Sequence, residues 1–574
     1  MPSLGANVQG DTVQFRVWAP KARQVRLRLM RADGTTKDLP MIPSGNGEFE
    51  LTINARARDR YFYLLDHDPL QIPDPVSRLL PNGVHGPTEV VDPLAFRWTD
   101  QNWRGLDFHD YIIYELHVGT FTPSGTFDGV IEKLDYLKDL GITAIELMPV
   151  GAFPGRRNWG YDGVSIYAVQ ESYGGPDGLK RLVNAAHEKG LAVLLDVVYN
   201  HLGNEGNYLG KFGPYFTSKH TTPWGDAINF DDRGSENVRR YFVENALYWV
   251  DEYHLDGLRL DAVHTIQDDS PTHILAEIRD AVREFESQSK RTICLVAETD
   301  ENSPRYVQPR KQGGYGLDAI WSDDFHHALH ALATGENEGY YQDFGRPEQL
   351  VRAINEGFAF QGEHFKFWGT TRGEPSVSME PEAHVICIQN HDQVGNRALG
   401  ERLTSLVSHA ARKNLAALLL LAPQTPLIFM GQETDEPAPF QFFTDYGDPV
   451  LQKAVSEGRR KEFKDFSSFG NHFPDPQDPA TFERSRLTWK LNPERRAILE
   501  WYKHLLQLRK TVYGRESRSA RAILVDSDSI RLDIPADKPK ISLTAFWTGE
   551  HEPKIEPVTP QQRGVKSDEV AARN

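Results

Sequence analysis

Two patterns of hydrophobic and polar positions divide the chain. Up to about residue 90, apolar and polar residues alternate, as in TVQFRVW (12–18), where Val13, Phe15 and Val17 share one face. QVRLRLM, EFELTI and RYFYLLD repeat the alternation, and the turn-forming sequence SGNG precedes EFELTI. Short alternating runs separated by turns are typical of antiparallel strands. This region is therefore predicted to form an N-terminal β-sandwich.

From about residue 110, apolar runs alternate with amphipathic segments. The segment FDGVIEKLDYLKDLG (127–141) has helical periodicity, and it lies between two apolar runs. Strand–helix alternation of this kind predicts a parallel sheet covered by helices. Eight such strands favour a closed (β/α)8 TIM barrel. The expected strands are YIIYELHV, ITAIELMPV, LAVLLDVVYNH, DGLRLDAVH, TICLVAET, GLDAIWSDD, HVICIQNHD and TPLIFMGQE.

The remaining segments connect or extend the barrel. Residues 68–93 are rich in Pro and Gly and are interpreted as a linker, and 199–235 as an excursion over the barrel mouth. Short strand-like runs such as SIRLDI return near the end of the chain. We therefore expect three regions: an N-terminal β-sandwich (1–90), a barrel with loop excursions (91–495), and the last barrel helix with a small C-terminal β-domain and an irregular tail (496–574).

Charge and composition narrow the function. The chain has 64 basic and 81 acidic residues, a net charge of −17, which argues against nucleic acid or an anionic membrane as a partner. No basic segment followed by an apolar run starts the chain, and no stretch of about 20 apolar residues occurs. We therefore expect a cytoplasmic protein. Cys294 and Cys387 lie in apolar runs and are expected to be buried and reduced.

Charged residues collect at the C-terminal ends of the predicted barrel strands, where barrel enzymes place their active sites. Asp261 ends one strand, Glu298 the next, and Asp392 a later one. Any one of these residues would usually be part of a structural ion pair, but carboxylates at the ends of three strands favour a catalytic role. No cluster with metal-ligand spacing accompanies them, and no cofactor or metal is expected. Paired carboxylates of this kind are the equipment of glycoside hydrolysis.

The two central carboxyl groups need opposite ionisation states at one pH. Arg259, two residues before Asp261, is expected to keep that Asp ionised, as a nucleophile must be. Glu298 has apolar neighbours in CLVAET and is the better candidate for a raised pKa and the acid role. Asp392 and nearby histidines would bind sugar hydroxyls and stabilise the positive ring.

Four motifs carry a family resemblance. DVVYNH, DGLRLDAVH, LVAET and CIQNHD, in this order, resemble the four motif regions of the α-amylase superfamily of glycoside hydrolases. The resemblance implies that Asp261 is the nucleophile, Glu298 the general acid/base and Asp392 the transition-state stabiliser. It also implies an aromatic stacked on the sugar at the cleavage point. The expected substrate-binding residues are Tyr161, His201, Trp224, Arg259, His264, His391 and Arg372.

Some of these positions also have a purely structural interpretation. Trp224 could stack on a glucose unit or simply anchor its loop, and Arg372, in TTRGEPS, could contact the acceptor sugar or form a surface ion pair. Asn200 matches a position that binds calcium in many members of the superfamily. No Asp-rich oxygen cage surrounds it in the sequence, so a hydrogen bond to a barrel loop is favoured.

Longer segments, among them NGVHGPTEVVDP and APFQFFTDYGDP, narrow the resemblance to one branch of the superfamily. Its members hydrolyse the α-1,4 bond next to the terminal trehalose of maltooligosyltrehalose, releasing trehalose and a maltooligosaccharide. Maltooligosyltrehalose and related α-glucans are then the expected partners. The nearest alternative is a 1,4-α-glucan branching enzyme, which would transfer the glycosyl unit to a sugar hydroxyl. A non-catalytic glucan-binding protein is disfavoured because all three carboxylates are present.

Overall fold

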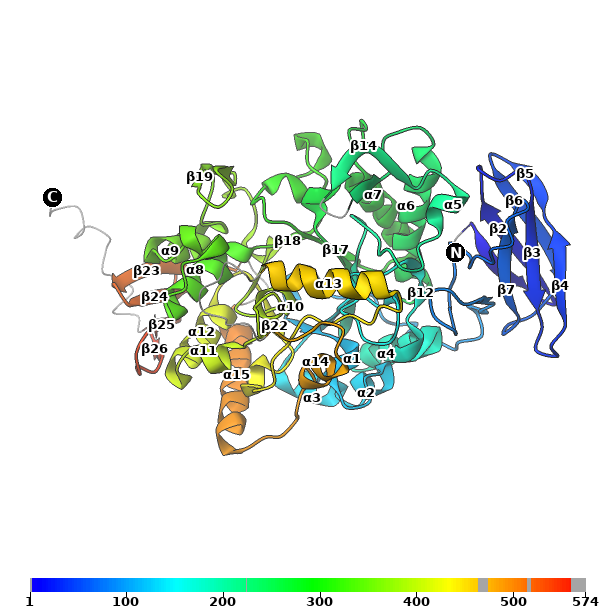
Figure 1. Ribbon diagram of the computed structural model, residues 1–574. Coiled ribbons are helices and arrows are strands. Elements are labelled where there is room, and N and C mark those ends of the chain that lie inside the picture. Colours follow the sequence, from blue (N-terminus) through cyan, green and yellow to red (C-terminus); the bar gives the residue numbers. More distant parts are fainter. Residues whose placement is uncertain (1–2, 223–224, 463–472, 514–517, 559–574) are drawn as a thin grey trace.

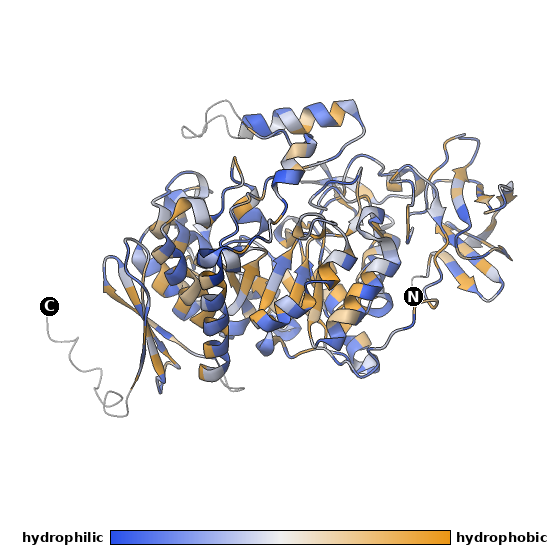
Figure 2. Ribbon diagram, turned by 90° about the horizontal axis from the view of Figure 1, so that it is seen from below, coloured by the Kyte–Doolittle hydropathy of each residue, from blue (hydrophilic) through white to orange (hydrophobic). Residues whose placement is uncertain are grey.

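The computed structural model describes residues 3–222, 225–462, 473–513 and 518–558. The N-terminal sheets and the C-terminal sheet lie at opposite ends of the molecule, with a β/α barrel between them (Figure 1). In Figure 2, hydrophobic positions concentrate in the middle of the molecule, on the barrel strands and on the helices around them. The expected fold class is confirmed.

Two four-stranded antiparallel sheets form the N-terminal sandwich. Val13, Phe15 and Val17 are all buried between the sheets, and the ring of Phe15 packs edge-on against Tyr61 at 4.9 Å. The alternation in TVQFRVW thus has its expected cause. The first sheet has the order β1 (Gly5–Gln9), β2 (Thr12–Trp18), β6 (Glu48–Asn54), β5 (Ile42–Gly45), and the second β4 (Thr36–Pro40), β3 (Val25–Met30), β7 (Arg60–Leu65), β8 (Thr88–Glu89).

Eight parallel strands close into a barrel, and each contains part of an expected strand. Most of their side chains are buried because helices cover the outer face and side chains fill the interior. In chain order the strands are β9 (Ile113–Leu116), β10 (Ala144–Leu147), β13 (Ala192–Val197), β16 (Gly257–Leu260), β17 (Cys294–Glu298), β18 (Ala319–Trp321), β21 (His384–Cys387) and β22 (Thr425–Phe429).

The helix expected over 127–141 is divided at Glu132 and Lys133 into two short helices, and it ends as predicted at Gly141. Gly141 has a φ of 109°, a conformation that favours glycine and terminates helices. The helices are α1 (Val118–Phe121), α2 (Phe127–Ile131), α3 (Leu134–Leu140), α4 (Gly175–Glu188), α5 (Leu209–Phe212), α6 (Ser235–Glu252), α7 (Ile274–Ser289), α8 (Asp323–Thr334), α9 (Pro347–Glu356), α10 (His391–Gly395), α11 (Leu403–Leu406), α12 (His409–Leu421), α13 (Pro449–Glu462), α14 (Pro479–Arg484) and α15 (Pro493–Val512).

Three small antiparallel pairs decorate the barrel. The excursion expected over 199–235 contains α5 and the hairpin β14 (Phe216–Thr222) and β15 (Gly225–Ile228). The other pairs are β11 (Gly151–Ala152) with β12 (Ser165–Val169), and β19 (Glu363–Phe365) with β20 (Thr370–Arg372).

A four-stranded antiparallel sheet follows α15, in the order β23 (Arg521–Asp526), β24 (Ser529–Ile534), β25 (Ile541–Phe546), β26 (Lys554–Pro557). The last of these corrects the prediction of an irregular tail from about residue 551, because β26 pairs with β25 as an edge strand. Residues 559–574 of that tail lie outside the described residues. The sheet is tied to the barrel helices; Asn355 of α9, for example, donates to the carbonyl of Ala522.

Both cysteines are free and buried, as expected. Among the described residues, no helix has the length and apolar character that a membrane span requires.

Candidate active site

Asp261 and Glu298 lie side by side at the C-terminal end of the barrel. In the parallel pairing of β16 with β17, Leu260 is opposite Ala297, so the next residue on each strand is Asp261 or Glu298. Their side chains are 12% and 14% exposed, respectively. Both carboxyl groups can therefore reach the same substrate.

Arg259 lies beneath both groups and is fully buried. Its Nη1 donates to Asp261 Oδ1 and to Asp196 Oδ2, each at 2.7 Å, and its Nη2 lies 3.6 Å from Glu298 Oε2. The ring of Trp321 packs 4.2 Å from the guanidinium carbon. Arg259 thus places a buried positive charge directly against the carboxyl group of Asp261.

Glu298 has the environment of a general acid. Burial raises its pKa well above the ordinary value, outweighing the opposing charge of Arg259. Its Oε2 accepts a hydrogen bond from the backbone nitrogen of Ala262 at 2.6 Å, which leaves Oε1 to carry the proton. Ala262 has a φ of 39°, a left-handed conformation that is unusual for alanine and that turns this N–H towards Glu298.

Asp392 enters from β21 through the short helix α10. Asn390 caps this helix, its side chain accepting from the nitrogen of Gln393 at 2.7 Å. Asp392 is 38% exposed, and its Oδ1 lies 3.4 Å from Nε2 of the buried His391. The same nitrogen is 2.7 Å from the hydroxyl of Tyr161.

These groups surround one cleft of about 630 Å³. Asp261, Glu298 and Asp392, from three different strands, all line it, as the sequence predicted for one shared place. Four of the expected substrate-binding residues line it as well: Tyr161, His201, His264 and His391.

The two other histidines that line the cleft, His201 and His264, differ in their partners. His201 donates Nε2–H to the carbonyl oxygen of Tyr161 at 3.0 Å, and burial lowers the pKa of its imidazole. His264 Nε2 lies 3.5 Å from Asp300 Oδ1, in the loop that follows β17. A second, polar cavity of about 420 Å³ begins beyond His264, between this loop and the loop that follows β16.

Of the other expected substrate-binding residues, Arg259 and Arg372 do not line the cleft. Trp224 lies outside the described residues. Arg372 is 3% exposed, and it donates to the carbonyl of Asp300 at 2.8 Å and pairs with Asp324 at 3.1 Å. Its guanidinium also packs 4.7 Å from the ring of Phe365. Arg372 thus connects β20 to α8 and to the loop that follows β17, and its charge is paired with that of Asp324.

The predicted hydrogen bond of Asn200 is absent. Its side chain is buried, and neither its oxygen nor its nitrogen has a hydrogen-bond partner among the residues described. Calcium binding requires several oxygen ligands. Within the described part of the chain, one group of three acidic or histidine side chains has the spacing of metal ligands. It contains none of the residues that flank Asn200 in the sequence.

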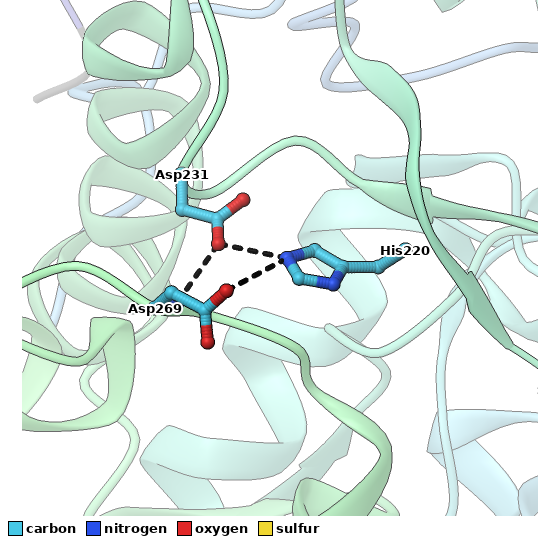
Figure 3. A group of neighbouring side chains, drawn as sticks. All are labelled: His220, Asp231 and Asp269. Atoms are coloured by element: carbon cyan, nitrogen blue, oxygen red, sulfur yellow. Dashed lines mark hydrogen bonds and ion pairs between the residues drawn. The ribbon is translucent and has the colours of Figure 1, made fainter.

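That group is His220, Asp231 and Asp269, whose ligand atoms lie within 4.8 Å of one another (Figure 3). Nε2 of His220 is 2.8 Å from Asp231 Oδ2, and the ammonium of Lys219 is 2.8 Å from the same oxygen and 3.3 Å from Asp269. Since Lys219 already supplies a positive charge, the cluster fits an ion-pair network. It ties the β14–β15 hairpin to the loop that follows β16.

Several residues around the cleft were not assigned a role from the sequence. Burial raises the pKa of Asp196 to about 6 despite Arg259, and burial with the charge of Asp392 raises that of Asp323 to about 7. Glu115 of β9 contacts His391 from inside the barrel. The sequence signal that could have identified such residues is the one that identified Arg259, namely a charged residue inside an apolar run.

Comparisons with known proteins agree with this geometry. The alpha amylase catalytic domain family matches residues 92–222 and 230–513, and carbohydrate-binding module 48, the isoamylase N-terminal domain, matches residues 3–76. Malto-oligosyltrehalose trehalohydrolase of Saccharolobus solfataricus is 48% identical over 513 residues, covering 89% of this chain and 87% of that protein. The enzyme of the same name from Deinococcus radiodurans is 45% identical over 87% of this chain and 81% of that protein.

Solved structures show the same architecture. A putative alpha amylase from Salmonella typhimurium superposes with a TM-score of 0.88 at 42% identity, covering 95% of this chain and 93% of that chain. A pullulanase from Anoxybacillus sp. LM18-11 shares the fold at a TM-score of 0.69 and 20% identity, over 95% of this chain and 81% of that chain. A 1,4-alpha-glucan branching enzyme from Corynebacterium jeikeium is 30% identical over 63% of this chain and 55% of that protein. The chain therefore belongs to the α-amylase family of glycoside hydrolases, in the group of the malto-oligosyltrehalose trehalohydrolases.

Proposed function

We propose that the cleft hydrolyses the α-1,4 bond next to the terminal trehalose of maltooligosyltrehalose, with Asp261, Glu298 and Asp392 as its catalytic residues. The observation that carries the proposal is that these carboxyl groups, from three strands, line one cleft together with four polar or aromatic residues suited to sugar hydroxyls. The likeness to trehalohydrolases over most of the chain supports the choice of substrate.

In the first step, an Asp261 carboxylate oxygen attacks the anomeric carbon, and the bond from that carbon to the glycosidic oxygen breaks. Glu298 gives its proton to the departing oxygen, so that trehalose leaves with a neutral hydroxyl. A glycosyl ester of Asp261 remains. This step requires a protonated Glu298 and a charged Asp261. The burial that raises the pKa of Glu298 and the hydrogen bond from Arg259 to Asp261 support this assignment.

In the second step, Glu298, now a carboxylate, takes a proton from water. The water oxygen bonds to the anomeric carbon, the ester bond to Asp261 breaks, and the maltooligosaccharide is released. Asp392 and His391 hold hydroxyls of the sugar at the cleavage point. The negative charge of Asp392 also stabilises the positive ring of the transition state.

The trehalose unit is assigned to the side of the second cavity. A general acid must lie within hydrogen-bond distance of the leaving oxygen, so the leaving sugar lies next to Glu298. The loop that follows Glu298 contributes Glu301 and Arg305 to the wall of the second cavity. His264 lines both the cleft and the cavity, at the junction between them. A sugar that leaves past Glu298 would therefore meet His264 first and the polar cavity next.

Product analysis tests the proposal. The purified wild-type protein and its Asp261→Asn variant are incubated with maltooligosyltrehalose, and the products are separated by chromatography. Wild type should release trehalose and a shortened maltooligosaccharide, whereas Asp261→Asn should bind substrate with no measurable turnover, because an amide cannot form the glycosyl ester. Branched products without trehalose would instead indicate glycosyl transfer. Near-normal turnover by the variant would remove Asp261 as nucleophile.

A further inference from the structure

Two buried carboxyl groups inside the barrel have no part in the steps above. Glu115 of β9 and Glu146 of β10 are opposite each other in the parallel pairing of these strands, and each is 1% exposed. They are the same residue type in neighbouring positions at the same depth. Their partners nevertheless differ, and this difference indicates a role for one of them.

Glu115 has two partners in one residue. Its Oε2 accepts from the backbone nitrogen of His391 at 3.0 Å, and its Oε1 contacts Nδ1 of the same residue. Glu146 has none: among the described residues, neither of its carboxyl oxygens has a hydrogen-bond partner. Two adjacent buried carboxyl groups do not both ionise. The charge therefore belongs on Glu115, which is hydrogen-bonded, and the proton on Glu146.

The other side of His391 determines its protonation. The hydroxyl of Tyr161 donates its single proton to Asp196 Oδ2 at 2.6 Å. The hydroxyl oxygen of Tyr161 also lies 2.7 Å from His391 Nε2. Because its proton is already given to Asp196, this oxygen can only accept there, and Nε2 must carry a proton. Nδ1 faces a carboxylate and must carry one as well. The hydrogen bonds thus require a doubly protonated imidazolium.

We propose that Glu115 is a positioning residue of the active site, whose carboxylate anchors His391 as an imidazolium and thereby orients the adjacent Asp392 and Tyr161 around the sugar.

The electrostatic surroundings agree with this geometry. Burial lowers the pKa of His391, but the charges of Asp392 and Glu115 outweigh it and raise the value to about 9. The burial of Glu146, followed by the charge of Glu115, raises the pKa of Glu146 well above its usual range. The titratable and charged groups that face His391 are Glu115 on β9, Glu146 on β10, His117 after β9, Tyr161 after β11, Asp196 on β13, Arg259 on β16 and Asp392 on α10.

Nuclear magnetic resonance of ¹⁵N-histidine-labelled protein tests the protonation directly, with the His391 signals assigned by their loss in His391→Gln. In wild type, both ring nitrogens should stay protonated through neutral pH. Glu115→Gln should lower the His391 pKa by about one to three units, because it removes an opposite charge in contact. Glu146→Gln is the matched control, and it should leave the titration unchanged because an amide replaces a neutral acid. A neutral His391 at neutral pH in wild type would overturn the proposal, even if Glu115→Gln failed to fold.

Kinetics supply a second test, which rests on the proposed function. The ratio of kcat for Glu115→Gln to kcat for Glu146→Gln is measured on maltooligosyltrehalose as the pH rises. In one pH range His391 should lose its proton in Glu115→Gln but keep it in Glu146→Gln. Over that range the ratio of the two kcat values should fall at least tenfold. A purely structural role would give a ratio that does not change with pH, and would contradict the proposal. If wild type released no trehalose, the proposed function would fail while the resonance experiment still decided the role of Glu115.

Discussion

The guanidinium of Arg259 lies 2.7 Å from the carboxylate of Asp261 and is fully buried. The two residues are two positions apart at the end of one strand, so their side chains leave the same face. The same nitrogen of Arg259 also contacts Asp196, at the end of the neighbouring strand β13. One buried cation therefore holds the proposed nucleophile and couples two strands of the barrel.

Replacing Arg259 should destabilise the fold as well as stop turnover. In Arg259→Gln the buried Asp196 and the partly exposed Asp261 lose their cation, which should lower the free energy of unfolding by about 3–5 kcal/mol. The control is Arg181→Gln, because Arg181 pairs with Asp128 at 2.9 Å but both side chains are about half exposed. That change should cost less than about 1 kcal/mol. Urea unfolding measures the free energy of unfolding of both variants. Equal decreases would show that the ion pairs of Arg259 stabilise the fold no more than an exposed ion pair does.

Glu298→Gln should reveal the acid role through its dependence on the leaving group. Because burial raises the pKa of Glu298, wild type should keep the proton of this group to higher pH than an ordinary glutamate does, and kcat/KM should fall as the pH rises through the raised pKa. The variant should lose about 10²–10⁴-fold on maltooligosyltrehalose. The first step on an aryl maltooligoside, whose leaving group needs no proton, should be spared. Pre-steady-state release of the aryl group measures this step, and equal losses on both substrates would exclude Glu298 as the acid.

The reaction should proceed with retention of anomeric configuration. Asp261 and Glu298 follow directly paired residues of neighbouring strands, which lie about 4.8 Å apart, and one guanidinium reaches both. Carboxyl groups about 5–5.5 Å apart are typical of double displacement, whereas inverting enzymes need about 6.5–9.5 Å to admit a water. Proton magnetic resonance of the fresh product should show the α-anomer at the new reducing end. An initial β-anomer would rule out Asp261 as nucleophile.

His187, at the end of the barrel opposite to the active site, should make the stability of the fold depend on pH. His187 is buried, with Nδ1 2.8 Å from Asp100 and Nε2 2.8 Å from Asp256. Burial lowers its pKa, but these two carboxylates outweigh burial and raise the pKa above the ordinary 6.5. The folded protein then binds this proton more tightly than the unfolded chain does. Its contribution is complete below pH 6.5 and is lost as the pH rises through the folded value.

His187→Gln should therefore lower the free energy of unfolding more in mildly acidic than in alkaline solution, by about 1.5–3 kcal/mol at the acidic end. His85 provides the control, because it also faces a carboxylate, Glu205, but its side chain is 55% exposed. His85→Gln should change stability little at either pH. Urea unfolding of both variants at two pH values measures the difference, and a loss in His187→Gln that is the same at both would contradict the assignment.

The sequence alone predicted the barrel strands and the three carboxyl groups that meet in one cleft. Each barrel strand is predicted from the sequence because a strand buried on both faces is mostly apolar, even where it contains a single charged residue such as Arg259. Asp261, Glu298 and Asp392 were recognised because each follows such a run, where a parallel barrel gathers its strand ends. Both inferences depend on residues within a few positions of one another. Local pattern is sufficient for them.

Only the tertiary structure decided which side chains meet. Glu115 and His391 are 276 positions apart, yet they are in direct contact inside the barrel. Arg372 was expected at the substrate, but it is bound instead by Asp324 of α8 and by Asp300 of the loop that follows β17. Hydrophobic periodicity indicates that a charged residue faces inward, but it does not identify its partner. A buried charge is costly unless it is paired with an opposite charge or accepts or donates hydrogen bonds. Closure of the barrel brings such partners together from segments that are far apart in the chain.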